Sequence, residues 1–127
     1  GVSLRCPAKG DPAHEGLEVQ LLDDASGLYK NIEPEQRSGA IYMQAAARTN
    51  ARAALPAGEW NRCEISCIGA EVIVRINDVE VNRVNLQAFK IGRNGRSALK
   101  DRPLSGVIAL EARSGRVEFR KVTVDKK

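Results

Sequence analysis

Apolar and polar residues alternate along GLEVQLLDD, residues 16–24, and this pattern predicts a strand with two different faces. Every second residue from Leu17 falls on one face, and Glu18 and Gln20 fall on the other, because successive side chains of a strand point to opposite sides. The apolar face belongs on a hydrophobic core. The other face carries a carboxylate and an amide roughly 7 Å apart at ~3.4 Å per residue. Such a pair can bind a polyol.

The same period of two predicts further short strands along the chain. They cover residues 2–6, 40–44, 60–68, 71–76, 79–83, 107–111 and 117–124. Asn77-Asp78 separates two of these strands and indicates a hairpin, since both residues tolerate a positive φ. In the last strand the alternation slips, and a bulge near Arg120 and Lys121 would bring its apolar residues to one face.

The segments between these strands predict loops. Residues 7–16, 25–38 and 85–105 are polar and contain Gly and Pro, and a helical turn is expected near Ala98. Residues 45–54 are rich in alanine, but we expect a loop there because no apolar stripe runs along them and strands flank them closely. Short strands without a convincing amphipathic helix predict an all-β fold, a single domain over residues 1–127 built as a two-sheet antiparallel sandwich.

Composition changes this picture little. A chain of 127 residues with 43% hydrophobic and 28% charged residues is typical of one globular domain. The net charge of +4 is modest, and the basic cluster at residues 90–102 has Phe89 as its sole aromatic neighbour. We therefore expect a solvated loop there and no nucleic-acid partner, because stacking platforms are missing. No apolar run approaches the length of a membrane span.

The cysteines and the histidine favour no metal centre. Cys63 and Cys67 share one face of a strand, about 13 Å apart if extended, which is too far for a disulfide. A disulfide from Cys6 to one of them is possible, but small buried thiols are the preferred interpretation. His14, the single histidine, lies in a loop without Cys or His neighbours, where a position at the rim of a cleft is the alternative to a metal role.

Several segments, taken in order, resemble the 3-keto-disaccharide hydrolase domain family. These segments are GLEVQLLDD, SGAIYMQ, LPAGEWNRCEIS, IVRINDVEV, LKDRPLSGVIAL and VEFRKVTV, and together they cover nearly the whole chain. The resemblance implies a jelly-roll sandwich of the concanavalin A-like, laminin G-like type with a concave sugar site. Family members are typically exported bacterial proteins that hydrolyse 3-oxidised glucosides. It therefore implies a carbohydrate ligand and a periplasmic or extracellular location.

The sequence departs from the family pattern in three places. Family domains usually carry β-strands before the segment that Gly1 begins, so we expect a domain truncated at its N-terminus. Missing strands would expose sheet edges that another copy or an absent segment should cover, which makes self-association possible. Arg113 stands where the family has a histidine, and Lys121 replaces a frequent asparagine. If that histidine takes part in the chemistry, this protein is impaired or uses another group.

Cleavage of a 3-keto-glucoside can proceed by elimination rather than by direct displacement. The ketone at C3 acidifies the C2 proton, so a base can remove it and expel the C1 substituent, after which water adds back. The route needs a base, a group that polarises the ketone and a proton for the leaving oxygen. We expect Glu18 to be the base. The alternative is a solvated carboxylate on a half-exposed strand.

Other side chains are candidates for sugar binding. Arg5 could polarise a carbonyl, or form a plain ion pair with the proposed base, and Gln20 could bind hydroxyls. Tyr42 can stack on a sugar face or donate its hydroxyl; an ordinary half-buried tyrosine is the alternative. The family position of Glu111 and Arg113 places them on or near the same concave sheet, unless they form only a surface pair.

Metal binding and the class of function stay open. Asp23 with Asp24 could hold a divalent metal ion together with loop oxygens, or could simply form a turn. Trp60 is expected to pack rather than bind. The leading hypothesis is an enzyme that acts on 3-keto-glucosides or related disaccharides, which the Glu18 strand favours. The alternative, favoured by Arg113, is a non-catalytic carbohydrate-binding or interaction module. A scaffold domain of a larger exported protein is a third possibility.

Overall fold

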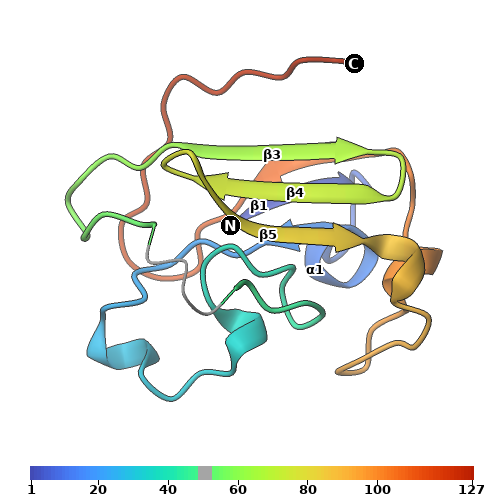
Figure 1. Cartoon of the computed structure of the whole chain (residues 1–127), viewed down its shortest axis with the longest axis horizontal. Helices are drawn as coiled ribbons and strands as arrows, with labels where there is room; N and C mark the ends of the chain where they lie inside the picture. Colours follow the sequence, from blue (N-terminus) through green and yellow to red (C-terminus); the bar gives the residue numbers. More distant parts are fainter. Residues whose placement is uncertain (49–52) are drawn as a thin grey trace.

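The computed structural model describes residues 1–48 and 53–127 and contains two three-stranded antiparallel sheets (Figure 1). The first sheet has the order β2-β1-β6, and the second has the order β3-β4-β5. The strands are β1 (Val2–Cys6), β2 (Leu17–Val19), β3 (Cys63–Ile68), β4 (Glu71–Ile76), β5 (Val79–Asn85) and β6 (Val107–Leu110). The prediction of an all-β sandwich is thereby confirmed.

The helical elements of the described residues are single turns. They are α1 (Pro12–Glu15) and the 3₁₀ turns η1 (Gly27–Tyr29), η2 (Pro34–Gln36), η3 (Leu86–Ala88) and η4 (Leu99–Asp101). The helical turn expected near Ala98 is thus η4, whereas α1 lies within a segment predicted to be loop. No helix in the part of the chain that the structure describes is long and apolar enough to span a membrane.

The second sheet follows the sequence pattern closely. Strands β3, β4 and β5 form a meander, and Asn77 and Asp78 make the expected hairpin turn with φ values of 48° and 67°. Their alternation directs one apolar face inward. Each strand therefore lies where its period of two predicts, although β3 begins at Cys63 rather than at Trp60.

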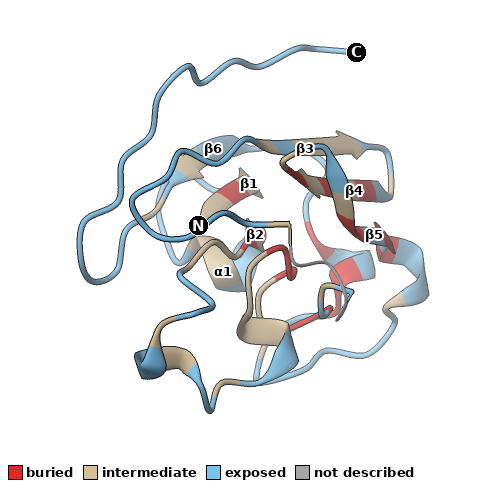
Figure 2. Ribbon diagram, turned by 60° about the vertical axis from the view of Figure 1, so that its left-hand side comes forward, coloured by how far each residue is buried: buried red, intermediate tan, exposed pale blue. Residues whose placement is uncertain are grey.

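The hydrophobic core lies between the sheets (Figure 2). Leu17 and Val19 of β2 are 0% exposed and pack in one cluster with residues of the second sheet. That cluster is completed by Ile41, Ala45, Val72, Val74, Ile76, Val81, Val84, Leu86 and Leu99. The two-faced character predicted for the Glu18 strand is therefore correct, since its apolar side points into the core.

The Glu18 strand is shorter than predicted. β2 ends at Val19 rather than at Asp24. The chain then pairs with residues 38–40 instead of with another long strand. The Gln20 backbone amide donates to the Ala40 carbonyl (3.0 Å), and the Ser38 hydroxyl donates to the Leu22 carbonyl (2.9 Å). Side-chain and loop hydrogen bonds replace a regular ladder here.

The strand predicted over residues 40–44 is wrong. Ile41 makes isolated bridges to Val19 and Ala45, and the residues between form a tight turn with Met43 at a φ of 60°. Gln44 is 2% exposed. Its amide donates to the Arg93 carbonyl (3.2 Å). A hydrogen bond from the buried Gln44 side chain thus stabilises a turn where the alternating sequence predicted a strand. Of the loop predicted over residues 45–54, residues 49–52 lie outside the described residues.

The strand predicted over residues 117–124 is also wrong. After β6 the chain runs without secondary structure to its end, away from both sheets (Figure 2). Lys121 has a φ of 52°, so the expected kink is present, but it lies in an unpaired segment. The apolar residues of this segment are exposed by 37–69%: Val117, Phe119, Val122 and Val124. Trp60 is also partly exposed, with the Arg120 guanidinium carbon 3.9 Å from its ring centroid.

Candidate functional site

Glu18 lies on the face of the first sheet that points away from the core. The register of β1 and β2 pairs Glu18 with Ser3, and the register of β1 and β6 pairs Ser3 with Ala109. Glu18 is half-buried, whereas Ser3 is 0% exposed. Side chains therefore cover this outer face at its middle, and Glu18 is not a fully solvated carboxylate.

Tyr42 lies beside Glu18 on the opposite side from Ser3. The bridge between Val19 and Ile41 sets the pairing, and the Tyr42 amide donates to the Glu18 carbonyl (2.8 Å). Gln20 follows the end of β2, and its backbone amide donates to the Ala40 carbonyl (3.0 Å). The structure thus places the backbones of Glu18, Gln20 and Tyr42 in one paired region, although through a turn at residues 42–44 rather than through the predicted strand.

A second carboxyl group, that of Glu111, lies next to this row. The Ser3 hydroxyl donates to a Glu111 carboxylate oxygen, and the Gly1 and Glu111 backbones exchange hydrogen bonds of 3.0 and 2.9 Å. The expectation that Glu111 would lie near the Glu18 sheet is therefore matched by its position just after β6. Ser3 was not among the predicted site residues, although its alternation with Leu4 indicates that it shares a face with Glu18.

The environment of Glu18 suits a group that exchanges protons. Burial and the neighbouring Glu111 carboxylate raise the pKa of Glu18 to about 7; the Gly1 amino group and Arg96 act against this rise, and Asp11 adds to it. A group with a pKa close to the operating pH is present in both protonation states and serves well as an acid or a base. Glu18 is such a group.

Arg96 completes the cluster and was missed as a site residue. Its guanidinium carbon lies 5.5 Å from the centre of the Tyr42 ring, and its charge acts on Glu18. One terminal nitrogen donates to the Asn94 carbonyl (3.2 Å), while the buried Nε has no hydrogen-bond partner among the described residues. No sequence signal marks Arg96 apart from its basic neighbours, because the fold of the loop alone decides which arginine turns inward.

The basic cluster at residues 90–102 was expected to be a solvated loop, and this expectation is wrong for Arg102. Arg102 is 4% exposed and donates to the Gly16 carbonyl (2.7 Å) and to the Ser97 carbonyl (3.0 Å). It therefore ties the loop between β5 and β6 to the start of β2. This buried arginine has a structural task that its sequence neighbourhood does not reveal.

Arg5 does not point toward Glu18. It has a φ of 53° at a register shift in β1, and its guanidinium donates to the carbonyls of Gly69 (2.8 Å) and Cys67 (3.3 Å) in the second sheet. The shift reverses the direction that simple alternation assigns to Arg5. The structure thus gives Arg5 a structural contact instead of the expected place at the site.

The remaining candidates lie outside the Glu18 cluster. Arg113 is exposed in the segment after β6, and no ion pair joins it to Glu111 within the described residues. Asp23 accepts a hydrogen bond from the Ala25 amide (3.1 Å), and Asp24 accepts one from the Ser38 amide (3.3 Å). These are the turn contacts named as the alternative to metal binding. Across residues 1–48 and 53–127, no group of three or more metal-ligating side chains is assembled.

The histidine and the cysteines lie apart from this cluster as well. His14 is exposed and its ring nitrogen lies 3.7 Å from an Asp11 carboxylate oxygen. All three cysteines are free thiols, but only Cys6 is buried as the preferred interpretation expected, whereas Cys63 and Cys67 are half-buried. The Cys6 thiol is buried and donates to the Val107 carbonyl (3.3 Å), so it joins β1 to β6.

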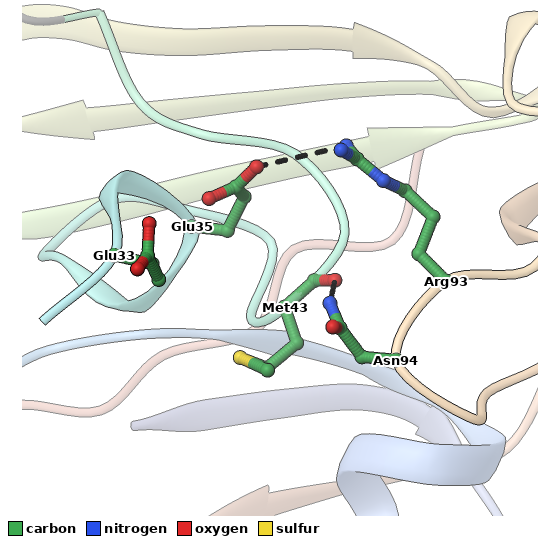
Figure 3. Close-up of a pocket in the computed structure, with 5 residues that line it drawn as sticks. All are labelled: Glu33, Glu35, Met43, Arg93 and Asn94. Atoms are coloured by element: carbon green, nitrogen blue, oxygen red, sulfur yellow. Dashed lines mark hydrogen bonds and ion pairs between the residues drawn. The ribbon is translucent and has the colours of Figure 1, made fainter.

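Two hollows lie on the far side of the 42–44 turn. The first, of about 470 Å³, is lined by Glu33, Glu35, Met43, Arg93 and Asn94 (Figure 3). Arg93 and Glu35 face each other across it at 3.6 Å. The second, of about 370 Å³, is lined by residues 88–91 and Arg93. Glu18 lines neither hollow. Met43 lines the first hollow, whereas its neighbour Tyr42 and Glu18 do not.

Comparisons with known proteins agree with this architecture. The sequence model of the 3-keto-alpha-glucoside-1,2-lyase-like domain matches residues 1–125. Two crystal structures from Parabacteroides distasonis ATCC 8503, both provisionally assigned as glycosyl hydrolases, share the fold at TM-scores of 0.77 and 0.64 and 24% identity. Each covers 85% of this chain, which spans 59% and 54% of theirs. No curated protein matches the sequence.

Proposed function

We propose, since the chain belongs to the 3-keto-alpha-glucoside-1,2-lyase-like domain family, that it cleaves the glycosidic bond of 3-keto-glucosides or related disaccharides by elimination and hydration. Glu18 is the base in this proposal. The observation that carries it is the half-buried Glu18 beside Glu111, with a pKa of about 7. Such a carboxylate is basic enough to take an acidified carbon-bound proton and is still partly ionised at neutral pH.

The proposed reaction begins at C2 of the oxidised sugar. Glu18 takes the C2 proton, and the electron pair forms an enolate with the C3 ketone. The pair then moves to the C1–C2 bond as the C1–O bond breaks, and the departing oxygen takes up the proton that Glu18 holds. Water adds to C1 and a proton returns to C2, so the net change is hydrolysis and Glu18 ends as it began.

Two further side chains support the binding of a sugar at this face. Tyr42 offers a ring face and a hydroxyl, and aromatic rings of this kind pack against apolar sugar faces while their hydroxyl groups bind polar atoms. Gln20 offers both a donor and an acceptor for hydroxyls. Both flank Glu18, as the pairing with residues 40–42 requires.

The test is turnover of a 3-keto disaccharide with release of the reducing product. We expect the wild type to release product and Glu18→Gln to lose at least about 10²-fold in kcat, the typical contribution of a positioned acid or base. Glu59→Gln is the matched control, because Glu59 is exposed in the turn before β3 and makes no side-chain hydrogen bond among the described residues. Unchanged turnover in Glu18→Gln would remove the base assignment.

A second candidate is a carbohydrate-binding module without turnover. Two points favour it: the family resemblance places Arg113 where a histidine is usual, and neither hollow is lined by Glu18. Calorimetry with 3-keto and ordinary glucosides separates the two functions. Binding without product release would support the module, whereas product release would exclude it.

Export of the protein stays a prediction from the family resemblance. Fractionation of cells that express the natural full-length protein would test it, and recovery of the protein only in the cytoplasm would contradict it. Cys6, Cys63 and Cys67 are free thiols, and free thiols are compatible with either location.

A further inference from the structure

The loop between η3 and η4 holds Arg96 in a fixed place above the outer face of the first sheet. The Arg96 amide donates to the Arg93 carbonyl (2.9 Å), and Asn94 and Gly95 have φ values of 53° and 72° that complete this tight turn. Turns with a positive φ suit Asn and Gly. The direction of the Arg96 side chain is therefore set by the backbone of this turn.

Three hydrogen bonds fasten this loop to the turn that carries Tyr42. The Asn94 amide donates to the Met43 carbonyl (2.8 Å; Figure 3), the Gln44 amide donates to the Arg93 carbonyl (3.2 Å), and the Arg93 guanidinium donates to the Gln44 carbonyl (3.3 Å). Because Gln44 is buried, water competes less for the two bonds that involve Gln44 than for the exposed Asn94 bond. Arg96 and Tyr42 are thus held together as one preorganised unit.

The Nε–H group of Arg96 is buried and unpaired within the described residues. Buried donors in folded proteins nearly always have a partner, and each exception calls for an explanation, of which a catalytic role is one. This donor lies in a guanidinium group over Tyr42, whose charge also acts on Glu18. An acceptor oxygen that enters beside Glu18 would satisfy it.

We propose that Arg96 binds the C3 ketone oxygen of the substrate through this N–H group and stabilises the oxyanion that forms when Glu18 removes the C2 proton. The inference rests on the proposed function. In the step concerned, the C2–H electron pair becomes the C2–C3 double bond and the C3 oxygen carries the negative charge. A fixed cation with a free donor is suited to that charge, because it needs no reorganisation as the charge develops.

The same contact explains a requirement for an oxidised substrate. A secondary hydroxyl at C3 cannot accept the developing charge, so an ordinary glucoside gains nothing from Arg96 in the transition state. We expect the enzyme to discriminate between a 3-keto-glucoside and the matching glucoside, and Arg96 to be the residue that makes the difference. The ketone-polarising role expected for Arg5 therefore passes to Arg96.

The first test compares Arg96→Gln and Arg96→Lys with the control Arg116→Gln. Arg116 is exposed and pairs only with Glu118 among the described residues, so the control removes the same charge outside the site. We expect Arg96→Gln to lower kcat about 10²–10³-fold, with a much smaller change in KM, and added guanidinium ion to restore part of the activity of Arg96→Ala. A structural role would not be rescued by a free cation. The proposal would be overturned if Arg96→Gln and Arg116→Gln lost kcat equally. It would also be overturned if Arg96→Ala were as stable as the control and guanidinium ion restored none of its activity.

The second test keeps this inference separable from the proposed function. Calorimetry measures the affinity of wild type and Arg96→Gln for 3-ketoglucose and for glucose. Tighter binding of 3-ketoglucose by wild type, lost in Arg96→Gln, supports the role of Arg96 even if no turnover is found. Undiminished preference for the ketone in Arg96→Gln overturns that role and leaves the base assignment to its own test. If wild type neither binds nor converts a ketone, both proposals fall.

Discussion

A single carboxyl group, that of Glu18, concentrates the chemical interest of this molecule. Its pKa of about 7 results first from burial and then from the Glu111 carboxylate. The raised value has a thermodynamic counterpart, because a proton that the folded chain holds more tightly than the unfolded chain links stability to pH. Residues that reduce stability in this way are common at functional sites, where activity rather than stability has been selected.

The stability of the domain should therefore fall as the pH rises from about 4.5, the ordinary value for a glutamate, to about 7. Below this window Glu18 is protonated in both states and contributes nothing; above it, the folded state carries the full cost of a half-buried charge. We expect Glu18→Gln to be more stable than wild type at pH 8 by about 1–2 kcal/mol, after allowance for solvent screening.

Urea denaturation at pH 4 and at pH 8 measures this difference. The two proteins should be alike at pH 4, and Glu59→Gln should follow wild type at both values. A variant that is less stable than wild type at pH 8 would show that the Glu18 carboxylate is stabilised by its surroundings, contrary to the burial seen here.

The sequence predicted Glu18 as a site residue but did not predict its neighbour Arg96. Alternation along β2 correctly separates Glu18 from Leu17 and Val19, because one buried face makes the register of a strand unambiguous. Arg96 could not be predicted in the same way. Its place depends on a turn at positive φ and on hydrogen bonds with residues 43 and 44, which no periodic pattern records.

At the scale of elements, the close approach of β1 and β2 depends on one glycine. A Cβ added at Gly16 would lie 2.5 Å from the Cys6 Cβ and 2.9 Å from the Leu4 carbonyl oxygen. Both neighbours are in β1, and Cys6 is buried, so neither can move freely. The strand that carries Glu18 can pair with β1 here only because residue 16 has no side chain.

We expect Gly16→Ala to destabilise the fold by about 1–3 kcal/mol, the usual cost of overpacking. Gly27→Ala is the control, because a Cβ there meets nothing within 4 Å and no unusual φ is required. Its stability should stay within about 1 kcal/mol of wild type. Thermal unfolding followed by circular dichroism compares the two. Equal stabilities would show that β1 and β2 have room to separate.

Strands β4 and β5 were predicted correctly and have one buried face, whereas residues 40–44 and 117–124 alternate without forming strands. Strands β4 and β5 bury Val72, Val74 and Val81, and the period of two finds them. The sequence Ile-Tyr-Met-Gln at residues 41–44 has the same period, but the buried residues there are Ile41 and Gln44, three apart, as a turn requires. Residues 117–124 alternate as well, but they have no facing strand in the described structure. Their apolar side chains therefore have no sheet to pack against.

At the scale of the whole molecule, apolar surface is concentrated along β6 and the segment that follows it. Side chains there are exposed by 37–69%: Val107, Ile108, Leu110, Val117, Phe119, Val122 and Val124. Monomeric proteins rarely expose contiguous apolar area of this kind. An unpaired β6 edge adds backbone donors and acceptors next to it. Both features favour association of one copy with another, which stays a prediction.

We expect the isolated domain to associate in a concentration-dependent way, and Phe119→Asp to reduce the association. The substitution should leave the unfolding temperature nearly unchanged, because Phe119 lies outside the core cluster. Ser114→Asp adds the same charge at an exposed polar position and is the control. Sedimentation equilibrium measures the effect. A wild type that stays monomeric at high concentration would contradict the expectation.

The kink in β1 turns one side chain of this strand, that of Arg5, toward the second sheet, while the strand itself stays in the first. Before it, Ser3 is sandwiched between Glu18 and Ala109 in the first sheet; after it, Arg5 is anchored to the Gly69 and Cys67 carbonyls of the second. Only Leu4 separates these two attachments. The two sheets are therefore linked through β1 at the row that holds Glu18 and Glu111. A sliding movement of one sheet past the other would displace Ser3.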